Sequence, residues 1–270
     1  PAMSETPESY PGRNILLVVP FAAGGPPDVI ARVLAPSMSE ALGRSIIVEN
    51  RPGASTTLGT LAVTRAAPDG YTLLASSLSM VVVPYVMAKP GFDPVIDLKP
   101  ISTTGFSPQT LVINQALPIK TAAELVAFAK ANPTDIKAAH TGIGTSTHLG
   151  LLALMQAGGF QTLLVPYRGA APAISDIVAG HISLLMTAPS TSIQLAREGK
   201  VRLLGVTGSK RMTAMPELPT LKEQGLDLAS LDSGVWFGLS APAGTPDAII
   251  DKLNAATRRA LAEKHVAETL

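Results

Sequence analysis

The stretch NILLVVPFAAGGPPDVIARVLAPSMSEAL, residues 14–42, contains an apolar run, a turn of small residues and a helical pattern in succession. The run at 14–20 is continuous rather than alternating, which is typical of a strand buried on both faces. From Asp28 to Leu42 the apolar side chains form one broad stripe, and Gly43 ends the predicted helix. Pro36 removes one internal hydrogen bond, so we expect a kink or a break there.

The same succession recurs along the chain. Helices are predicted after Thr121, which forms a capping box with Glu124, and from the Thr245–Asp247 start to about Glu263. Strands that alternate with helices predict an α/β fold with mostly parallel sheets and right-handed crossovers. The further apolar runs are residues 45–50, 71–76, 110–114, 136–140, 162–166, 182–186, 201–207 and 234–240.

The composition limits the class of protein. The 270 residues suffice for one large or two medium domains. Lys and Arg number 21 against 20 Asp and Glu, and the net charge of +1 argues against a nucleic-acid-binding surface. Zero Cys excludes disulfides and thiolate metal sites. The mean hydropathy of +0.31 resembles that of a membrane protein, but the sequence contains no run of about 18 apolar residues.

A weak internal similarity links the two halves of the chain. Val19–Pro26 aligns with Val165–Pro172, and each segment contains a strand end, an aromatic residue, a turn of small residues and the start of a helix. Because the pattern occurs once in each half, we expect two lobes built on the same strand–loop–helix plan.

The residues that follow the predicted strands are mostly glycine, alanine, serine and threonine. In parallel sheets, ligands bind beside the carboxyl ends of the strands. Hydroxyl groups and unpaired N–H groups at helix N-termini suit an anion. These loops contain no carboxylate pair and no cluster of metal ligands, so the sequence predicts a site that holds a carboxylate without catalytic residues, metal or cofactor.

Three other interpretations of these loops stay open, although the residues favour them less. Gly142–Thr147 follows a strand like a dinucleotide fingerprint, but the third glycine and the acidic residue are missing. His140 and His148 would need two further ligands to form a structural zinc site. Ser146 with His148 suggests a nucleophile and a base, but no carboxylate is placed to orient the imidazole. Arg168 either pairs with a carboxylate or covers surface.

Several motifs in sequential order resemble those of a known family. Together they resemble the Bug family of periplasmic solute-binding receptors, the extracytoplasmic component of tripartite tricarboxylate transporters. The resemblance extends from about Ile15 to the end of the chain. The motifs are Pro20–Asp28, Val48–Ala54, Ala67–Leu74, Gly144–Leu149, Val165–Ala173 and Trp236–Pro246.

The resemblance implies a two-lobed Venus-flytrap fold, type II-like, with the ligand in the cleft between the lobes. We expect lobe 1 to comprise residues 1–103 and 222–270, and lobe 2 residues 104–221. A small carboxylate would be held by loop amides, hydroxyls and bridging waters. The expected ligand-binding residues are Phe21, Ala22, Ala23, Gly24, Gly25, Ser76, Ser77, Thr145, Ser146, Thr147, Arg168, Gly169, Ala170 and Thr187.

Two positions depart from the family pattern. Many members carry an acidic residue directly after the strand that ends here at Met186, where this chain has Thr187. An acid there would suit a ligand ammonium, so its absence favours an aromatic or aliphatic dicarboxylate over an amino acid. The family also continues past the helix that closes here at Leu270, so we expect either a truncated chain or a short member.

The expected function is capture of the carboxylate by hinge closure and delivery to membrane permease subunits, by a monomer that is not an enzyme. Residues 1–14 contain two glutamates and no hydrophobic run, so they are not a signal peptide. We expect a periplasmic protein whose signal peptide has been removed. The alternatives are a hydrolase that uses Ser146 and His148, and a ligand sensor that feeds a signalling partner without transport.

Overall fold

The computed structural model describes residues 9–232 and 234–269. The chain divides into two compact units, residues 1–105 with 236–270, and residues 106–235. We call them the first and the second unit, and each is described by itself. The expectations for the first eight residues and for Leu270 lie outside the described part of the chain.

The second unit extends further along the chain than residue 221, where the expected lobe 2 ends. Residues 222–235 group with the second unit. Leu226, Leu228 and Leu231 are buried there in one core cluster with Leu111. Apolar contacts within the second unit therefore determine where this segment belongs.

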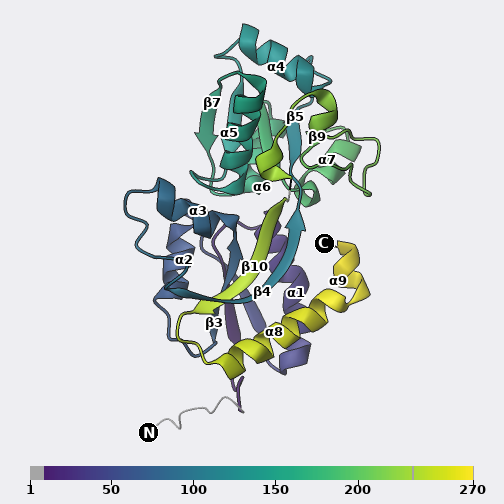
Figure 1. The fold of residues 1–270 in the computed structure, drawn as a ribbon. Coiled ribbons are helices and arrows are strands. Elements are labelled where there is room, and N and C mark those ends of the chain that lie inside the picture. The colour runs from purple at the N-terminus through teal and green to yellow at the C-terminus, as the bar shows by residue number, and fades with distance from the viewer. Residues whose placement is uncertain (1–8, 233, 270) are drawn as a thin grey trace. The chain divides into compact units, whose positions relative to one another are not determined.

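The sheet of the first unit has the strand order β2-β1-β3-β10-β4. Figure 1 labels β3, β10 and β4 of this sheet. β1 (Ile15–Val19) pairs in parallel with both β2 (Ile46–Asn50) and β3 (Thr72–Ser77). β10 (Val235–Pro242) is antiparallel to β3. β4 (Leu98–Ser107) lies at the edge beside β10.

Helices cover both faces of this sheet, as the continuous apolar strands predict. Leu17 belongs to a core cluster with Leu34 and Leu253, which lie on two helices of one face. Val18, the next residue, belongs to another cluster with Val63. The helices are α1 (Pro26–Leu42), α2 (Thr57–Thr64), α3 (Leu78–Val86), α8 (Asp247–Ala262) and α9 (Lys264–Thr269).

Helix α1 runs through Pro36 without the break that the sequence suggested. Pro36 itself is exposed, whereas Leu34 and Met38 on either side are fully buried. Packing of α1 against the sheet and α8 therefore outweighs the missing hydrogen bond.

The sheet of the second unit has the order β7-β6-β8-β5-β9. β6 (Lys137–His140) pairs in parallel with β7 (Leu163–Pro166) and β8 (Leu184–Thr187). β5 (Thr110–Asn114) is antiparallel to both β8 and β9 (Val201–Val206). The helices are α4 (Ala122–Ala131), α5 (Ser146–Gly158), α6 (Ala170–Val178) and α7 (Ile193–Arg197), with 3-10 turns at Pro189–Thr191, Lys222–Gln224 and Ala229–Leu231.

The predicted start of α4 is present in the structure. Thr121 is the N-cap, and its Oγ1 accepts the backbone N–H of Glu124 at 3.1 Å. The Glu124 carboxylate accepts the N–H of Lys120 at 2.6 Å, one residue before the usual partner. In the described part of the chain, no helix is long and apolar enough to cross a bilayer.

The two sheets share a plan, and each is a mixed sheet built around three parallel strands. In each, the first of three parallel strands lies between the second and the third, and an antiparallel strand, β10 or β5, follows on one side with an edge strand beyond it. The strand equivalent to β1 is therefore β6. The internal similarity in the sequence instead aligned β1 with β7, so it marks a local resemblance of loops and not equivalent strands.

Strand β4 was not predicted as a strand from the sequence. The expected boundary between the lobes, at residues 103–104, lies within it. Pro100 and Gly105 interrupt the segment, and both residues normally argue against a strand. β4 lies at the sheet edge, where a missing N–H leaves no neighbouring strand unpaired.

Candidate functional site

The candidate residues of the first unit lie at one edge of its sheet. Because β2, β1 and β3 are parallel neighbours, the loops after them lie at the same end of the sheet, beside the carboxyl ends of the strands. We call this end the carboxyl edge. Phe21–Gly25 connects β1 to α1, and Gly25 is the N-cap of that helix. Ser76 and Ser77 end β3, and Ser77 is the N-cap of α3.

Asp28 organises the first of these loops, a role that the sequence analysis missed. Its side chain is buried, and its carboxylate accepts the N–H of Gly24 at 2.9 Å and the amide of Asn50 at 2.8 Å. Arg32 donates from Nε to both carboxylate oxygens at 3.0 Å. Asn50 also donates to the carbonyl of Phe21 at 3.1 Å. The sequence signal was an acid in the first turn of a helix that follows a glycine turn.

The negative charge of Asp28 is compensated by hydrogen-bond donors around the loop. Burial raises its pKa, but the hydrogen bonds from Arg32, Gly24 and Asn50 and the charge of Arg32 outweigh burial, so the pKa is lowered. The carboxylate therefore stays ionised and has its partners within the first unit. It is not free to neutralise a cationic ligand group.

Two hydroxyl groups near the same edge are buried without a hydrogen-bond partner. They are Ser79 Oγ in the first turn of α3 and Thr56 Oγ1 before α2. Thr56 follows Ala54 and Ser55, and the φ angles of the three are 77°, 45° and 53°. Three consecutive left-handed residues without glycine are strained, and such strain often accompanies a functional loop.

Ser76 and Ser77 differ in their surroundings. Ser76 Oγ accepts a hydrogen bond from Ser240 Oγ of β10 at 3.2 Å, so it links two strands. Ser77 is buried, and its side chain makes no capping bond to α3. Because Ser76 Oγ is the acceptor in its bond, both serines keep a hydroxyl hydrogen for another acceptor.

The candidate residues of the second unit also share one carboxyl edge, because β7, β6 and β8 are parallel neighbours. Thr145 caps α5 after β6, and Gly169 caps α6 after β7. Thr187 is the last residue of β8. The three strand ends therefore bring their loops to the same side of the sheet.

The hydroxyls of Thr145 and Thr147 are engaged within the loop itself. Thr145 Oγ1 donates to the carbonyl of Gly142 at 2.6 Å. Thr147 Oγ1 accepts the N–H of Thr141 at 2.8 Å, and it lies 3.0 Å from Thr141 Oγ1 and 3.1 Å from Thr145 Oγ1. The resemblance implied Thr145 and Thr147 as ligand-binding residues, and in the structure their hydroxyls support the loop.

The free donors of this loop belong to the first turn of α5. The N–H of Leu149 donates to the carbonyl of Thr145 at 2.9 Å and makes the first helical bond. The preceding N–H groups, of Ser146, Thr147 and His148, have no intrahelical acceptor. Ser146 is partly exposed, and no described residue accepts its hydroxyl. Three amides and one hydroxyl therefore remain for an anion at the positive end of the helix.

His140 and His148 flank the same loop. His140 Nδ1 accepts the N–H of Gly142 at 3.1 Å, and His148 Nδ1 accepts the N–H of Gly144 at 3.3 Å. The ring centroids are 4.8 Å apart. Burial lowers the pKa of both imidazoles, and the charge of His140 adds to this effect for His148.

The remaining candidates of the second unit are less polar or already paired. Arg168 is exposed, and Gly169 and Ala170 are buried at the start of α6. Thr187 Oγ1 lies 3.1 Å from Thr191 Oγ1, with which it shares a hydrogen bond. Among the described residues, no three His, Asp or Glu side chains gather where they would hold a metal ion.

The tyrosine of the loop after β7 helps to fix its path. The N–H of Tyr167 donates to the carbonyl of His140 at 2.7 Å. Its hydroxyl donates to Asp176 on α6 at 2.5 Å. Burial and then the bond to Asp176 raise the pKa of Tyr167 to about 12, so the phenol stays a donor at neutral pH.

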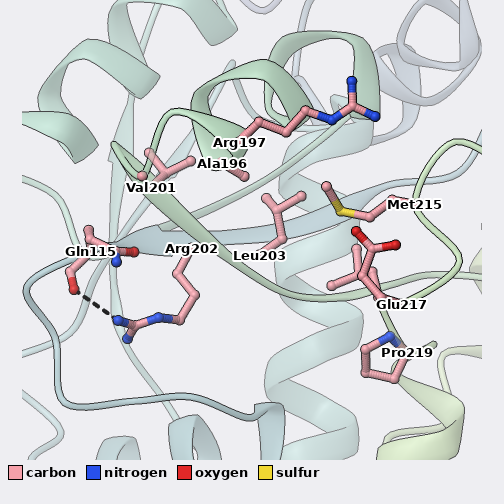
Figure 2. A pocket seen from close by; sticks show the side chains of 11 residues that line it. Gln115, Ala196, Arg197, Val201, Arg202, Leu203, Met215, Glu217 and Pro219 are labelled. Atoms are coloured by element: carbon pink, nitrogen blue, oxygen red, sulfur yellow. Dashed lines mark hydrogen bonds between the residues drawn. The ribbon is translucent and has the colours of Figure 1, made fainter.

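A cavity of about 500 Å³ in the second unit lies apart from these loops (Figure 2). It is lined in part by Val201 and Arg202, at the beginning of β9. The other end of β9 pairs with Thr110, which lies beside Thr187, so the cavity is at the opposite edge of the sheet. The Arg202 guanidinium already donates to the carbonyls of Gln115, Leu117 and Ile119. None of the candidate residues lines this cavity.

Comparison with known proteins identifies similar sequences and folds. Residues 30–270 match the family model described as the tripartite tricarboxylate transporter family receptor. The structure of the periplasmic binding protein BugD is 37% identical with a TM-score of 0.92, over 96% of this chain and 86% of BugD.

Two further structures were solved with ligands. MatC of Rhodopseudomonas palustris, with bound malate, is 33% identical with a TM-score of 0.92, over 97% of this chain and 88% of that one. Another R. palustris protein, with adipate, is 30% identical with a TM-score of 0.92, over 97% and 87%. These likenesses confirm the expected periplasmic binding protein fold, built on two mixed α/β sheets.

Proposed function

Because the chain belongs to the tripartite tricarboxylate transporter receptor family, we propose that it is a periplasmic receptor that captures a small dicarboxylate for membrane permease subunits. The observation that carries this proposal is the first turn of α5. The amides of Ser146, Thr147 and His148 lack intrahelical acceptors, and the Ser146 hydroxyl lies beside them. A carboxylate accepts such N–H groups strongly, and the helix dipole adds to the attraction.

In this proposal each unit supplies candidate ligand donors at the carboxyl ends of its parallel strands. The second unit supplies the α5 donors, and the first unit supplies the Phe21–Gly25 loop and Ser77. Ligand contacts made only when both units engage favour the closed form, because a ligand shifts an equilibrium only by its difference in affinity. The protein acts as a monomer, and release to the permease follows reopening.

The ligand class follows from the charges at the candidate loops. The acid in those loops, Asp28, is neutralised by Arg32, and Thr187 offers a hydroxyl where an acid would pair with an ammonium. An amino acid would therefore bury an unpaired positive charge, which is costly. The malate and adipate of the similar structures are dicarboxylates without an amine. We favour aliphatic or aromatic dicarboxylates over amino acids.

Catalysis is not part of the proposal. The similar proteins described above are binding proteins, and His148 Nδ1 accepts the Gly144 N–H instead of facing an orienting carboxylate. Turnover of a simple ester that disappears in Ser146→Ala would contradict this.

A thermal-shift screen over carboxylates tests the function. A dicarboxylate at about one hundred times its Kd should stabilise the protein by about 2.7 kcal/mol. For a chain of this size that corresponds to roughly 5–10 °C. Malate, adipate and terephthalate should raise Tm more than aspartate or glutamate. A flat response to all of them would refute carboxylate binding, and a larger shift with amino acids would refute the ligand class.

A further inference from the structure

We propose that His140 and His148 are positioning residues whose neutral rings hold the α5 loop (Thr141–Thr145) in its anion-binding form, so that acid weakens ligand binding. The proposal rests on the function proposed above and adds a regulation of the same site. It concerns two of the four histidines, since His181 and His265 are exposed and lie elsewhere.

The two rings anchor the loop at two points. His140 ends β6 and is 4% exposed, and its Nδ1 accepts the Gly142 N–H at 3.1 Å. His148 lies in the first turn of α5, and its Nδ1 accepts the Gly144 N–H at 3.3 Å. The φ angles of Gly142 and Gly144 are 129° and 77°, in the region that favours glycine. The two hydrogen bonds to the histidine rings hold the loop in this conformation.

Each of these bonds needs a lone pair on Nδ1. A neutral imidazole can accept there while it carries its proton on Nε2. An imidazolium has N–H on both nitrogens, so protonation sets an N–H against the N–H of the glycine. The ring must then turn or the loop must move. The ring centroids are 4.8 Å apart, so the two rings would also repel each other if both were protonated.

The anchored loop determines the position of the anion donors. The carbonyl of Gly142 accepts both the hydroxyl of Thr145 at 2.6 Å and its N–H at 3.2 Å. Thr145 is the N-cap of α5, directly before the free amides of Ser146 and Thr147. Displacement of Gly142 therefore removes the bonds that orient the cap, and the amides no longer converge on one anion.

The surroundings in the second unit give an imidazolium no counter-charge. The strands β7 and β8 and helix α5, which pack around the pair, contain no Asp, Glu, Lys or Arg. Lys137 lies at the other end of β6, and Arg168 before α6 is a further cation. Asp176 of α6 is bonded to Tyr167.

The direction of the pH effect follows from these surroundings. Burial lowers the pKa of both rings below the ordinary value near 6.5. The loop is therefore intact at neutral pH. The loop loses these two hydrogen bonds as the pH falls through the pKa values of the two rings. The loss lowers both the stability of the second unit and its affinity for the ligand. If the ligand carboxylate were instead attracted to an imidazolium, affinity would rise as the pH falls. The direction in which affinity changes with pH therefore decides between the two explanations.

Calorimetric titration with adipate and with malate, from about pH 8 to about pH 4.5, tests the proposal. His140→Asn is the key variant, because Oδ1 of asparagine occupies the place of Nδ1 and accepts the same N–H without titrating. The ratio of wild-type to His140→Asn Kd should grow as pH falls and reach about fivefold or more at the acid end, since one required deprotonation gives up to tenfold per pH unit. The ligand's own titration affects both proteins equally. His265→Asn, at an exposed position of α9 in the first unit, is the matched control and should follow the wild type.

His140→Leu removes the acceptor and keeps the apolar volume. It should bind more weakly than His140→Asn at every pH, and thermal melts report whether it is folded. If it does not fold, the comparison of wild type with His140→Asn still decides.

Nitrogen NMR of the ligand-free protein gives an independent readout. At neutral pH both imidazoles should show an unprotonated Nδ1 and a protonated Nε2. Parallel pH profiles for wild type and His140→Asn, tighter wild-type binding in acid, or a protonated Nδ1 would each overturn the inference. Failure of the wild type to bind any carboxylate of the thermal-shift screen at about pH 8 would instead refute the function on which the inference rests.

Discussion

At the residue scale, the hydroxyls in the motif Thr145-Ser146-Thr147 have different roles. The sequence places all three after a strand at the start of a helix, which predicts the loop as a candidate anion site. It does not show which hydroxyl points into the loop, because that depends on the backbone path through Gly142 and Gly144. The structure directs Thr145 and Thr147 inward and leaves Ser146 without a protein partner.

Ser146→Ala and Thr145→Val should therefore differ. Ser146→Ala should weaken dicarboxylate binding by about 1–3 kcal/mol with little change in Tm, since only a donor to the ligand is removed. Thr145→Val should lower both affinity and Tm, because the bond to Gly142 is lost. Titration calorimetry and thermal melts measure the two effects, and Thr145→Ser is the control that keeps the hydroxyl. Equal Tm losses for the two variants would contradict the assignment.

Asp28 was not recognised from the sequence as a supporting residue, since its partner Asn50 is distant in sequence and is brought close only by the pairing of β1 with β2. Asp28→Asn should lower the free energy of unfolding by about 1–3 kcal/mol, because a buried charge-assisted network loses its acceptor. Urea unfolding measures this, with exposed Asp251→Asn as the control.

The pH dependence of that loss has a definite sign. The pKa of Asp28 is lowered in the folded protein, so its stabilisation is present above the unfolded pKa, near 3.9, and disappears as pH falls through the folded pKa. The difference between wild type and Asp28→Asn should therefore shrink in acid. A difference that does not change down to about pH 2 would argue against an ionised Asp28.

At the element scale, continuous apolar runs located every strand except β4, because helices cover both faces of each sheet. The period of the pattern carries no information on strand direction, so the antiparallel pairings of β5 and β10 did not emerge. The same limit explains the alignment of β1 with β7. Similar turn chemistry follows both strands, but their places in the two sheets differ.

Pro36 allows a test of how tertiary packing overrides local preference. Pro36→Ala restores an N–H four residues after Arg32, at an exposed position within α1. It should raise the free energy of unfolding by about 1–3 kcal/mol, as proline is disfavoured in a helix interior. Pro26→Ala is the matched control and should give no such gain, because the first helical N–H has no acceptor in the helix. Chemical denaturation of both variants measures the difference, and destabilisation by Pro36→Ala would show that α1 needs the proline.

At the scale of the whole molecule, a net charge of +1 on 270 residues gives no broad field to attract anions. Selectivity must then come from a few local donors and from the response of the two units to the ligand. The chain passes between the units at residues 105–106 and 235–236. Both passages lie within strands, the first in β4 and the second in β10.

The single tryptophan lies at the second of these passages, as Trp236 is the first residue of the returning segment of the first unit. If ligand binding changes the arrangement of the units, a saturating dicarboxylate should change the emission of Trp236 and lower the radius of gyration measured by small-angle scattering. Ser146→Ala should require more ligand for the same change, because its affinity is lower while the passage itself is intact. Binding seen by calorimetry without any change in emission or radius would show that capture occurs without closure. The loops of one unit would then have to hold the carboxylate alone.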